Sequence, residues 1–248
     1  GKTAAFGIGL LEKIDPATQD IQALVLCPTR ELADQVGREL RRLARAVANI
    51  KLVSLCGGKP FGPQKASLQH GAHIVVGTPG RLLDHLQRGT LRLAALQTLV
   101  FDEADRMLDM GFAESIKEIM GFVPRKRQTL LFSATYPAEI KAISAAFQHN
   151  PTVVNVDTEH GGEVIEQLFY QVNQHERNKT LLALFSHYKL TSALVFCQTK
   201  VECSQVAALL RENHIQALAI HGDLDQRERD RVLLQFANSS CAVLVARD

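Results

Sequence analysis

Two short segments contain residue types that could bind and hydrolyse a nucleoside triphosphate. The first is Gly1-Lys2-Thr3, which precedes a stretch with helical character, AAFGIGLLEKI. In a phosphate-binding loop of this kind, backbone N–H groups hold phosphate oxygens, the lysine neutralises the β- and γ-phosphates, and the threonine hydroxyl reaches Mg²⁺. The tripeptide alone is weak support for such a loop, because the upstream glycine of the motif does not precede it.

The second segment, 96–105, reads LQTLVFDEAD and joins an apolar run to consecutive acids. An acid at the carboxyl end of a parallel strand faces the ligand crevice. There Asp102 could hold Mg²⁺ through water, and Glu103 could orient or deprotonate an attacking water molecule. A solvated acidic turn is the simpler interpretation, but it does not explain the Gly-Lys-Thr in the same half of the chain. Together the two segments predict a site that hydrolyses a nucleoside triphosphate.

A third segment, LLFSATYP (130–137), places small hydroxyl residues after another apolar run. Ser133 and Thr135 are expected to form hydrogen bonds across a crevice to Asp105, which would connect the acidic segment to a neighbouring strand. A simple turn is also compatible with the chemistry of these residues.

Three further loops place Gly, Thr and Arg at the ends of apolar runs, and these residue types contact phosphates. If the runs are neighbouring parallel strands, the loops line one surface. No aromatic residues interleave them, so we expect contact with a nucleic-acid backbone without base stacking or sequence reading. Each loop taken alone could be an ordinary turn. The candidate residues are Pro28, Thr29, Arg30, Gly57, Gly58, Thr78, Gly80 and Arg81.

The second half of the chain has its own polar stretch, HGDLDQRERDRVLLQF (221–236), which is charged at first and then apolar at helical spacing. Gln226 and Arg229 could contact a phosphate backbone from there. On charge alone, a solvated helix start with i,i+3 and i,i+4 pairs is the favoured interpretation.

The elements that must position these residues alternate along the chain. Short apolar runs recur, each followed by an amphipathic segment such as RELADQVGRELRRLARAV (30–47). Fully apolar runs of this length are typical of strands in a parallel sheet that helices cover on both faces. The pattern therefore predicts a doubly wound α/β fold. Strands are expected at 23–27, 51–56, 73–77, 98–101, 129–132, 152–156, 167–172, 193–197, 217–220 and 242–245.

One strand-and-helix unit occurs twice. ALVLCPTRELADQV (23–36) is matched at an offset of 170 residues by ALVFCQTKVECSQV (193–206), with the Cys-x-Thr and Gln-Val pairs in common. Two later runs also have counterparts, so three strands recur in the same order, which predicts a duplicated domain. The later counterparts are 52–58 with 218–223, and 73–77 with 242–246.

The length of 248 residues suits two modest α/β domains. We expect a first domain at 1–157, a polar linker at 158–163 that contains a Gly pair, and a second domain at 164–248. The chain starts at Gly1 without a Met and stops at Asp248 directly after an apolar run, so both domains are expected to be truncated at the chain ends.

Composition narrows the class of protein. Hydrophobic residues make up 46% and charged residues 22%, which is typical of globular domains and not of disorder. The net charge of +2 says little about partners. The five cysteines form no C-x-x-C pair, so neither a disulfide framework nor a zinc site is expected, and a reducing cytosol fits best. No apolar run has membrane-spanning length and no signal peptide is visible, so we expect a cytoplasmic protein with no membrane partner.

The order of the motifs resembles that of the DEAD-box RNA helicases over essentially the whole chain. The resemblance implies two tandem RecA-like domains with ATP in the cleft between them, so that the repeated unit is one RecA-like domain used twice. The matching segments are Gly-Lys-Thr (1–3), PTRELA (28–33), Gly-Gly (57–58), TPGR (78–81), DEAD (102–105), SAT (133–135), VFCQT (195–199) and HGDLDQRERD (221–230).

The resemblance also implies roles for individual residues. ATP and Mg²⁺ are the implied cofactors, with Gly1, Lys2 and Thr3 at the nucleotide and Thr3 and Asp102 at the metal. Asp102 and Glu103 would be catalytic, and Asp105, Ser133 and Thr135 would couple the two domains. The RNA backbone would be held by the three loops of the first domain and by Thr199, Gln226 and Arg229 of the second.

In such enzymes ATP and RNA together close the two domains, one RNA strand is bent, and short duplexes open locally. The resemblance further implies ribosomal RNA as the partner, a role in assembly of the large ribosomal subunit, and a monomer at full length. Two rival functions stay open: a two-domain ATPase that acts on DNA, and an ATP-dependent RNA clamp that does not turn over.

The chain departs from the family pattern in several places. The phosphate loop lacks its first residues, no adenine-recognising segment precedes it, and Arg247 stands where the family usually has Thr. The arginine-rich segment that normally reaches the γ-phosphate would follow Asp248. Residues 1–248 alone are therefore expected to hydrolyse little ATP.

Overall fold

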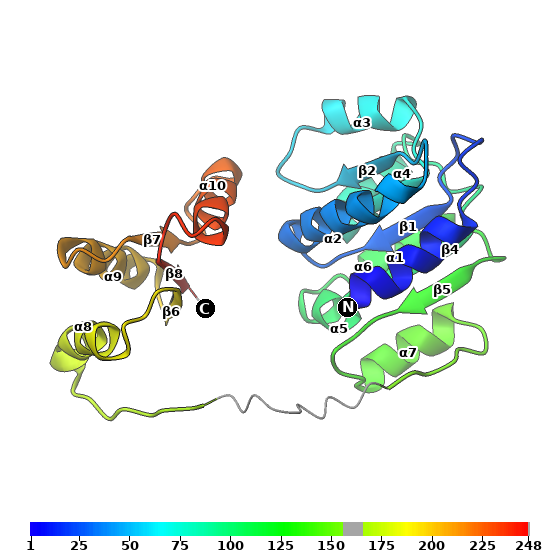
Figure 1. Ribbon diagram of the computed structural model, residues 1–248. Coiled ribbons are helices and arrows are strands. Elements are labelled where there is room, and N and C mark those ends of the chain that lie inside the picture. Colours follow the sequence, from blue (N-terminus) through cyan, green and yellow to red (C-terminus); the bar gives the residue numbers. More distant parts are fainter. Residues whose placement is uncertain (156–165, 248) are drawn as a thin grey trace. The chain divides into compact units, whose positions relative to one another are not determined.

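The computed structural model describes residues 1–155 and 166–247. The chain divides into two compact units, Gly1–Val156 and Asp157–Asp248, and each contains its own parallel sheet (Figure 1). The predicted α/β fold with two parallel-sheet domains is confirmed. The expected linker, 158–163, lies outside the described residues, and its bounds stay a prediction.

The first unit contains a five-stranded parallel sheet in the order β2-β3-β1-β4-β5. Strands β1, β3 and β4 are buried at every position, which explains why their sequences are uninterrupted apolar runs. Leu24 of β1 is aligned with Val75 of β3 on one side and with Leu99 of β4 on the other. The strands are β1 Ala23–Leu26, β2 Leu52–Leu55, β3 Ile74–Gly77, β4 Thr98–Phe101 and β5 Gln128–Leu131.

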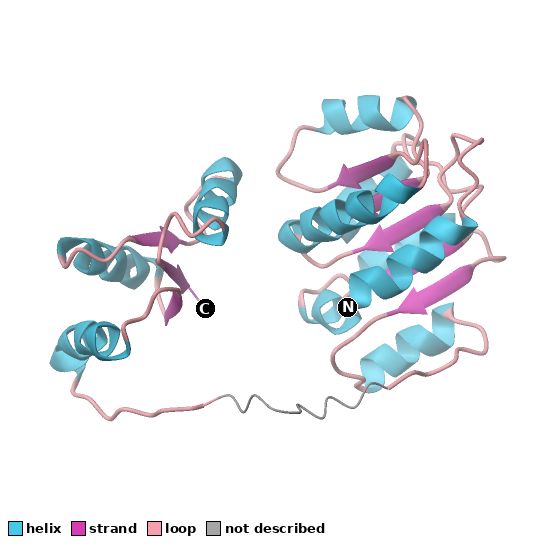
Figure 2. Ribbon diagram, in the orientation of Figure 1, coloured by secondary structure: helices cyan, strands magenta, loops and turns pink. Residues whose placement is uncertain are grey.

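Successive residues of these strands enter two separate cores, because side chains alternate across a sheet. Leu24 and Leu99 belong to the core beneath α4, α5, α6 and α7, whereas Val25 and Val100 belong to the core beneath α1 and α2. Figure 2 shows helices on both sides of this sheet. The helices are α1 Lys2–Lys13, α2 Arg30–Leu43, α3 Phe61–Gln69, α4 Pro79–Gln87, α5 Ala104–Asp109, α6 Ala113–Phe122 and α7 Ala138–Phe147, with a short 3₁₀ helix at Ala44–Ala46.

The second unit contains a three-stranded parallel sheet in the order β6-β8-β7. Its core joins Phe185 of α8 to the buried side of α9 and to Val243 and Val245 of β8. On β6, Leu194 and Phe196 are 55% and 64% exposed. The strands are β6 Ala193–Cys197, β7 Ala217–Ile220 and β8 Val243–Arg247, and the helices are α8 Arg177–Tyr188, α9 Lys200–Glu212 and α10 Gln226–Ala237, with a 3₁₀ helix at Gln174–Glu176.

The repeat seen in the sequence is a repeat of the fold. In the first unit β3 lies between β1 and β2, and in the second unit the corresponding β8 lies between β6 and β7. Helices α2 and α9 both start after a threonine whose hydroxyl accepts a hydrogen bond from the N–H three residues on: Leu32 N–H to Thr29 at 3.2 Å, and Glu202 N–H to Thr199 at 3.1 Å. The buried positions of the two helices also correspond at the offset of 170: Ala33, Val36, Gly37 and Leu40 with Cys203, Val206, Ala207 and Leu210.

Two of the predicted strands were wrong. Residues 152–155 and 167–172 form no strand in the described part of the chain, and Val156 is not described. A strand needs a neighbouring strand to complete its backbone hydrogen bonds, and no described strand pairs with either run. Their side chains are exposed instead, with Val154 at 79% and Phe169 at 89%.

In the parts of the chain that the structure describes, no helix combines the length and apolar character needed to span a membrane.

Candidate nucleotide site and nucleic-acid interface

Asp102 lies at the carboxyl end of β4. Its backbone N–H donates to the Leu26 carbonyl at 3.0 Å, and the residue is only 4% exposed. Burial raises the pKa of its carboxyl group, the positive charge of Lys2 opposes that rise, and the charge of Glu103 adds to it. A buried carboxylate of this kind is stabilised by any further cation that binds beside it.

Glu103 has the left-handed backbone conformation, with φ 53° and ψ 56°, at the N-cap of α5. For a residue with a Cβ this conformation costs about 1–2 kcal/mol. Hydrogen bonds hold it on both sides, from the Ala104 N–H to the Phe132 carbonyl at 3.0 Å and from the Met107 N–H to the Glu103 carbonyl at 3.1 Å. The half-buried Glu103 carboxylate lies 3.4 Å from the Arg106 guanidinium. Strain of this kind is typical of functional sites.

Asp105, Ser133 and Thr135 are connected as the sequence predicted. The Thr135 hydroxyl and backbone N–H both donate to one Asp105 carboxylate oxygen, at 2.9 and 3.0 Å. The Asp105 N–H in turn donates to the Ser133 hydroxyl at 3.3 Å. Burial acts to raise the pKa of Asp105, but the hydrogen bonds from Thr135 and Ser133 outweigh it and the pKa is lowered. The contact is confirmed, whereas a role in coupling the two domains stays a prediction.

Gly1, Lys2 and Thr3 form the amino end of α1. Gly1 is the N-cap, and its carbonyl accepts a hydrogen bond from the Ala5 N–H at 3.1 Å. The Phe6 ring of α1 lies 5.3 Å from the Phe132 ring, and the Phe132 carbonyl accepts a hydrogen bond from the Ala104 N–H beside Glu103, so α1 lies close to the carboxyl end of β4. The charge of Lys2 also acts on the Asp102 carboxyl group. The structure therefore brings the two nucleotide-binding candidates together, and their roles at a nucleotide stay predictions.

The donor groups at this edge fit Mg²⁺. This ion prefers oxygen ligands and is usually held by one or two carboxylates together with substrate phosphates. Asp102 supplies a buried carboxylate, and Thr3 supplies a hydroxyl in the first turn of α1. No group of three or more His, Cys, Asp or Glu side chains placed to hold a metal occurs within 1–155 and 166–247. The residues present suit an ion shared with the phosphates of a nucleotide.

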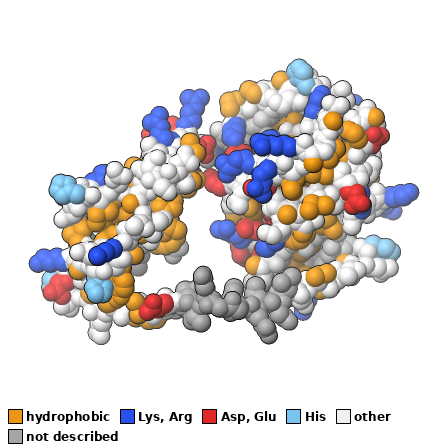
Figure 3. Space-filling model, in the orientation of Figure 1, with side chains coloured by type: hydrophobic (Ala, Val, Ile, Leu, Met, Phe, Trp, Pro, Cys, Tyr) orange, Lys and Arg blue, Asp and Glu red, His pale blue; other side chains and the backbone are white. Residues whose placement is uncertain are grey.

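The three candidate phosphate-binding loops of the first unit follow β1, β2 and β3 and lie at the same edge of the sheet as Asp102. Backbone hydrogen bonds fix their relative position: the Cys27 N–H donates to Gly77 at 2.9 Å, and the Thr78 N–H donates to Leu55 at 3.1 Å. Pro28 and Thr78 are buried and shape the turns, whereas Gly58 and Gly80 are exposed. Figure 3 shows Lys and Arg side chains gathered on one face of this unit.

Arg30 lies across the Gly-Gly loop. A Cβ added at Gly57 would lie 3.5 Å from the Arg30 guanidinium, and a Cβ at Gly58 would overlap it. Gly58 also has φ +70°, a conformation that side chains rarely adopt. The loop is therefore glycine-rich for two reasons: its backbone turn and the close approach of Arg30.

We expect Gly58→Ala to lower the free energy of unfolding by about 1–2 kcal/mol, because it adds a Cβ in the left-handed region. Gly62→Ala is the control, since a Cβ at Gly62 meets nothing within 4 Å and alanine is favoured over glycine in α3 by up to about 1 kcal/mol, so this variant should be at least as stable as the wild type. Urea unfolding of the two variants measures the difference. Equal stabilities would contradict the steric role of Gly58.

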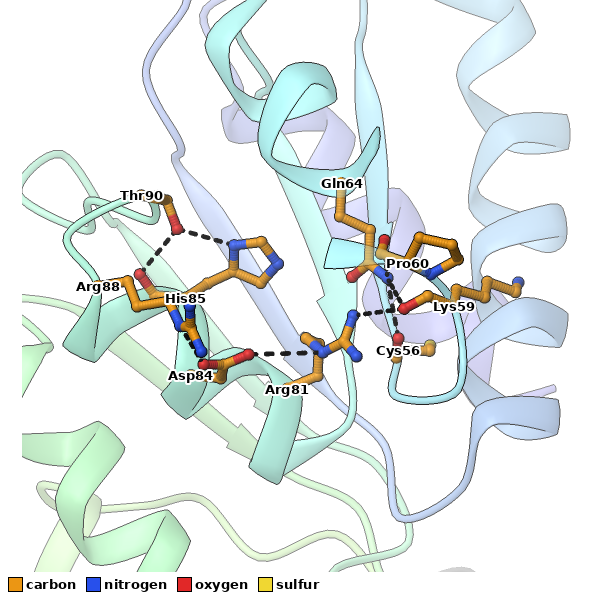
Figure 4. A network of polar contacts seen from close by, with 9 residues as sticks. All are labelled: Cys56, Lys59, Pro60, Gln64, Arg81, Asp84, His85, Arg88 and Thr90. Atoms are coloured by element: carbon orange, nitrogen blue, oxygen red, sulfur yellow. Dashed lines mark hydrogen bonds and ion pairs between the residues drawn. The ribbon is translucent and has the colours of Figure 1, made fainter. Parts of the chain in front are cut away.

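Two side chains hold the backbone of this loop, Arg81 from α4 and Gln64 from α3 (Figure 4). The Arg81 guanidinium donates to the Lys59 carbonyl at 2.9 Å and lies 3.9 Å from Asp84. The buried Gln64 amide donates to the Cys56 carbonyl at 3.0 Å and reaches the carbonyls of Lys59 and Pro60 at 3.5 Å. The loop backbone is thus fixed before any ligand binds. No motif in the sequence points to Gln64, although its partners lie only four to eight residues before it in the chain.

A stacked cluster fixes the first turn of α3 to α4. The Phe61 ring stacks on His85 with centroids 4.1 Å apart, and the Arg88 guanidinium lies 4.7 Å over the same Phe61 ring. His85 Nδ1 lies 2.8 Å from the Thr90 hydroxyl, which itself donates to the His85 carbonyl (Figure 4). Nδ1 is therefore the protonated nitrogen of the ring. Burial lowers the pKa of His85, and the positive charge of Arg81 lowers it further.

In the second unit, the predicted RNA-binding residues lie after β6 and β7. Thr199 caps α9, and the neighbouring Lys200 joins the β7 loop through Asp223 at 2.8 Å. Arg229 donates to the Gly222 carbonyl of that loop at 2.9 Å, and Gln226 donates to Asp230 at 3.0 Å. The charged stretch does begin a helix, with Asp225 and Glu228 in a capping box, as the simpler interpretation expected.

Two models of known protein families match the chain. Residues 1–143 match the model of the DEAD/DEAH box helicases, and residues 176–248 match the helicase conserved C-terminal domain. The chain belongs to the DEAD/DEAH box helicase family. The family match covers both units, and it places the acids after β4 and the three loops in one helicase core.

Among curated relatives, the helicase core is 56% identical over 248 residues to the ATP-dependent RNA helicase DbpA of Escherichia coli, with 100% of this chain and 54% of that protein covered. It is 44% identical over 249 residues to the DEAD-box ATP-dependent RNA helicase CshA of Bacillus subtilis, with 100% and 50% covered. The chain spans about half the length of the curated relatives it matches.

Two solved structures are also similar. Saccharomyces cerevisiae Dbp5 bound to RNA and ADP BeF3 is 28% identical with a TM-score of 0.85, and the match covers 100% of this chain and 63% of that one. A DEAD box protein from Methanococcus jannaschii is 39% identical with a TM-score of 0.62, with 100% and 66% covered. These matches support the RecA-like assignment of both sheets.

Proposed function

We propose that the full protein is an ATP-dependent RNA helicase whose two RecA-like domains lie near 1–157 and 164–248. The observation that carries the proposal is the shared edge of the first sheet. The buried Asp102 and the strained Glu103 follow β4 there, and the three Gly- and Arg-containing loops follow β1, β2 and β3. One edge of the sheet thus contains both residues that can bind a nucleotide and residues that can bind the phosphates of an RNA backbone.

At the nucleotide, different residues of the chain have different roles. The backbone at Gly1 and the charge of Lys2 bind phosphate oxygens, and Thr3 and Asp102 hold Mg²⁺. Glu103 orients a water molecule and accepts its proton, and the fixed left-handed backbone keeps the carboxylate in place for that step. When bound, Mg²⁺ neutralises charge on the β- and γ-phosphates.

At the RNA, the three loops bind phosphates without reading bases. Arg30 and Arg81 supply guanidinium groups on the two sides of the Gly-Gly loop. Thr199, Gln226 and Arg229 supply contacts from the second domain. Asp105, Ser133 and Thr135 couple hydrolysis to domain closure, which opens short duplexes locally. Both Dbp5 with bound RNA and the RNA helicases DbpA and CshA support RNA as the substrate.

The resemblance to this family extends the proposal to ribosomal RNA, to assembly of the large ribosomal subunit, and to a cytoplasmic monomer. The similarity to DbpA over all 248 residues supports this finer assignment. The test is phosphate release by the full protein with ATP and Mg²⁺, in the presence of ribosomal RNA, unrelated RNA of equal length, or DNA. We expect strong stimulation by RNA and little by DNA. Equal stimulation by DNA would favour a DNA-acting ATPase, and binding without turnover would favour an RNA clamp.

Substitution of Arg30 or Arg81 by alanine should weaken RNA binding by about tenfold or more, the usual scale for a charged hydrogen bond. The loss should be the same for different RNA sequences, and the slope of log affinity against log salt should fall by roughly 0.7 for each phosphate that is no longer bound. Arg92→Ala is the control, because Arg92 is exposed and precedes β4 at the opposite edge of the sheet. A loss that depends on RNA sequence would contradict backbone binding.

A further inference from the structure

Lys59 follows the Gly-Gly loop directly and forms an ion pair that the sequence did not predict. Its ammonium group lies 3.0 and 3.2 Å from the two carboxylate oxygens of Asp34. Asp34 is four residues after Arg30 on α2, so the two side chains lie on the same face of that helix. The Arg30 guanidinium in turn lies against Gly57 and Gly58. An acid therefore stands among the cations that the proposed function assigns to RNA phosphates.

The backbone of Lys59 is held by hydrogen bonds, whereas its side chain is held by an exposed ion pair. Arg81 and Gln64 hold the Lys59 carbonyl, whereas the ammonium group extends away from Arg81 on the other side of the loop (Figure 4). The lysine side chain is 43% exposed and that of Asp34 is 34% exposed. An ion pair this exposed shifts an equilibrium by only about two- to fivefold. A phosphate that approaches Arg30 can therefore replace Asp34 as the partner of Lys59 without a movement of the loop.

The electrostatic effect on Cys56 agrees with this geometry. Burial is the main reason that the pKa of the Cys56 thiol is raised to about 11, and Asp34 raises it further, whereas Lys59 and Arg30 lower it. The charges of Asp34, Lys59 and Arg30 thus all affect the Cys56 thiol at the carboxyl end of β2. A bound phosphate would add a negative charge at a place where Asp34 already supplies one.

We propose that Lys59 is an RNA phosphate-binding residue and that Asp34 restrains it by competing with the phosphate. This inference rests on the proposed function, and it adds a contact and a residue that limits RNA affinity. Substitutions of the two members of the pair should therefore have opposite effects on RNA affinity. Loss of Lys59 removes a phosphate contact, whereas loss of the Asp34 charge releases the lysine and removes a repulsion.

The test measures binding of the full protein to a fluorescent single-stranded polyadenylate RNA, with an ATP analogue, over a range of salt concentrations. We expect Lys59→Gln to weaken binding and to lower the salt slope by roughly 0.7. We expect Asp34→Asn to tighten binding about two- to fivefold. In the double variant, most of the gain from Asp34→Asn should disappear, because no lysine remains to be released and only the removed repulsion still contributes.

Two charge-matched controls separate local contact from net charge. Glu39→Gln removes a negative charge from α2, where Glu39 pairs with Arg42 at 2.8 Å, and Lys65→Gln removes a positive charge from the exposed side of α3. Both should change affinity less than the corresponding variants of the Lys59–Asp34 pair. Thermal melting confirms that each variant is folded.

Three results would overturn the inference. If Asp34→Asn and Lys59→Gln both weakened binding, the pair would be a brace for the loop. If Asp34→Asn kept its full gain in the Lys59→Gln background, the effect would be long-range charge alone. If Lys59→Gln matched Lys65→Gln, Lys59 would not contact RNA. Failure of the proposed function itself looks different: the wild-type protein would not bind RNA, or Arg30→Ala and Arg81→Ala would have no effect.

Discussion

Replacement of Glu103 by glutamine should lower ATP turnover of the full protein by roughly 10²-fold or more, the usual scale for the loss of a general base. Glutamine keeps the size of the side chain but cannot accept a proton from water. ATP and RNA binding should be retained, because the substitution leaves Lys2, Asp102 and the phosphate-binding loops unchanged. Phosphate release at saturating ATP and RNA measures the effect.

The structure indicates that this loss would not come from unfolding. Glutamine can adopt the left-handed conformation of Glu103 about as well as glutamate, and its own backbone hydrogen bonds are unchanged. The ion pair with Arg106 is removed, but its members are 31% and 65% exposed, and such pairs contribute about 0–1 kcal/mol. Glu114→Gln, in the first turn of α6, is the matched control and should keep normal turnover. Turnover of Glu103→Gln at the wild-type rate would exclude Glu103 as the base.

The central strands β1, β3 and β4 of the first sheet could be predicted because each is buried on both faces. A residue such as Val25 or Val100 has no polar neighbour in its strand, so the apolar run itself marks the element. The same reasoning failed at 152–156 and 167–172. An apolar run indicates that side chains avoid water, but it does not show that a neighbouring strand is present, and in the described residues of these runs there is none.

The site was predictable where one strand leads directly into a functional group. Asp102 follows β4 and Thr29 caps α2, and both relations are local in sequence. The pairing of Lys59 with Asp34 is not local, because it depends on the positions of α2 and of the loop after β2. Gln64, by contrast, contacts carbonyls only four to eight residues before it, and it was missed because no motif marks it. Parallel strands allow many spatial orders, and only the structure establishes that β3 lies between β1 and β2.

Because Asp102 is buried, its replacement by asparagine is expected to have opposite effects on ATP turnover and on the thermal stability of the protein. Asp102→Asn should lower ATP turnover by about 10²-fold or more, since several kcal/mol of metal-assisted charge stabilisation would be removed. The same substitution should make the ligand-free protein more stable to heat. The residue is 4% exposed, and burial is the main reason that its pKa is raised. Asparagine has the same shape, but it carries no charge to be buried.

The pH dependence checks the cause of that gain. An acid whose pKa is raised by folding binds its proton more tightly in the folded state, so stability falls as pH rises from the ordinary carboxyl value of 3.8 through the raised pKa. Above that range the wild-type protein carries the full penalty, and Asp102→Asn does not. The difference in melting temperature between the two should therefore be largest near neutral pH and should vanish below pH 3.8.

Melting of the ligand-free protein and of the protein with Mg²⁺ and an ATP analogue completes the test. Ligand that binds only the folded state raises the melting temperature, so the wild-type protein should gain more from Mg²⁺ than Asp102→Asn does. Asp109→Asn, at the exposed end of α5, is the control and should behave as wild type in both conditions. Two results would contradict this interpretation: a lower melting temperature of Asp102→Asn than of wild type without ligand, or a full response of Asp102→Asn to Mg²⁺. In either case the carboxylate would be a structural group and would not be needed to bind the ion. The expected combination, higher stability with lower turnover, would show that the fold tolerates an unfavourable buried charge because the site needs it.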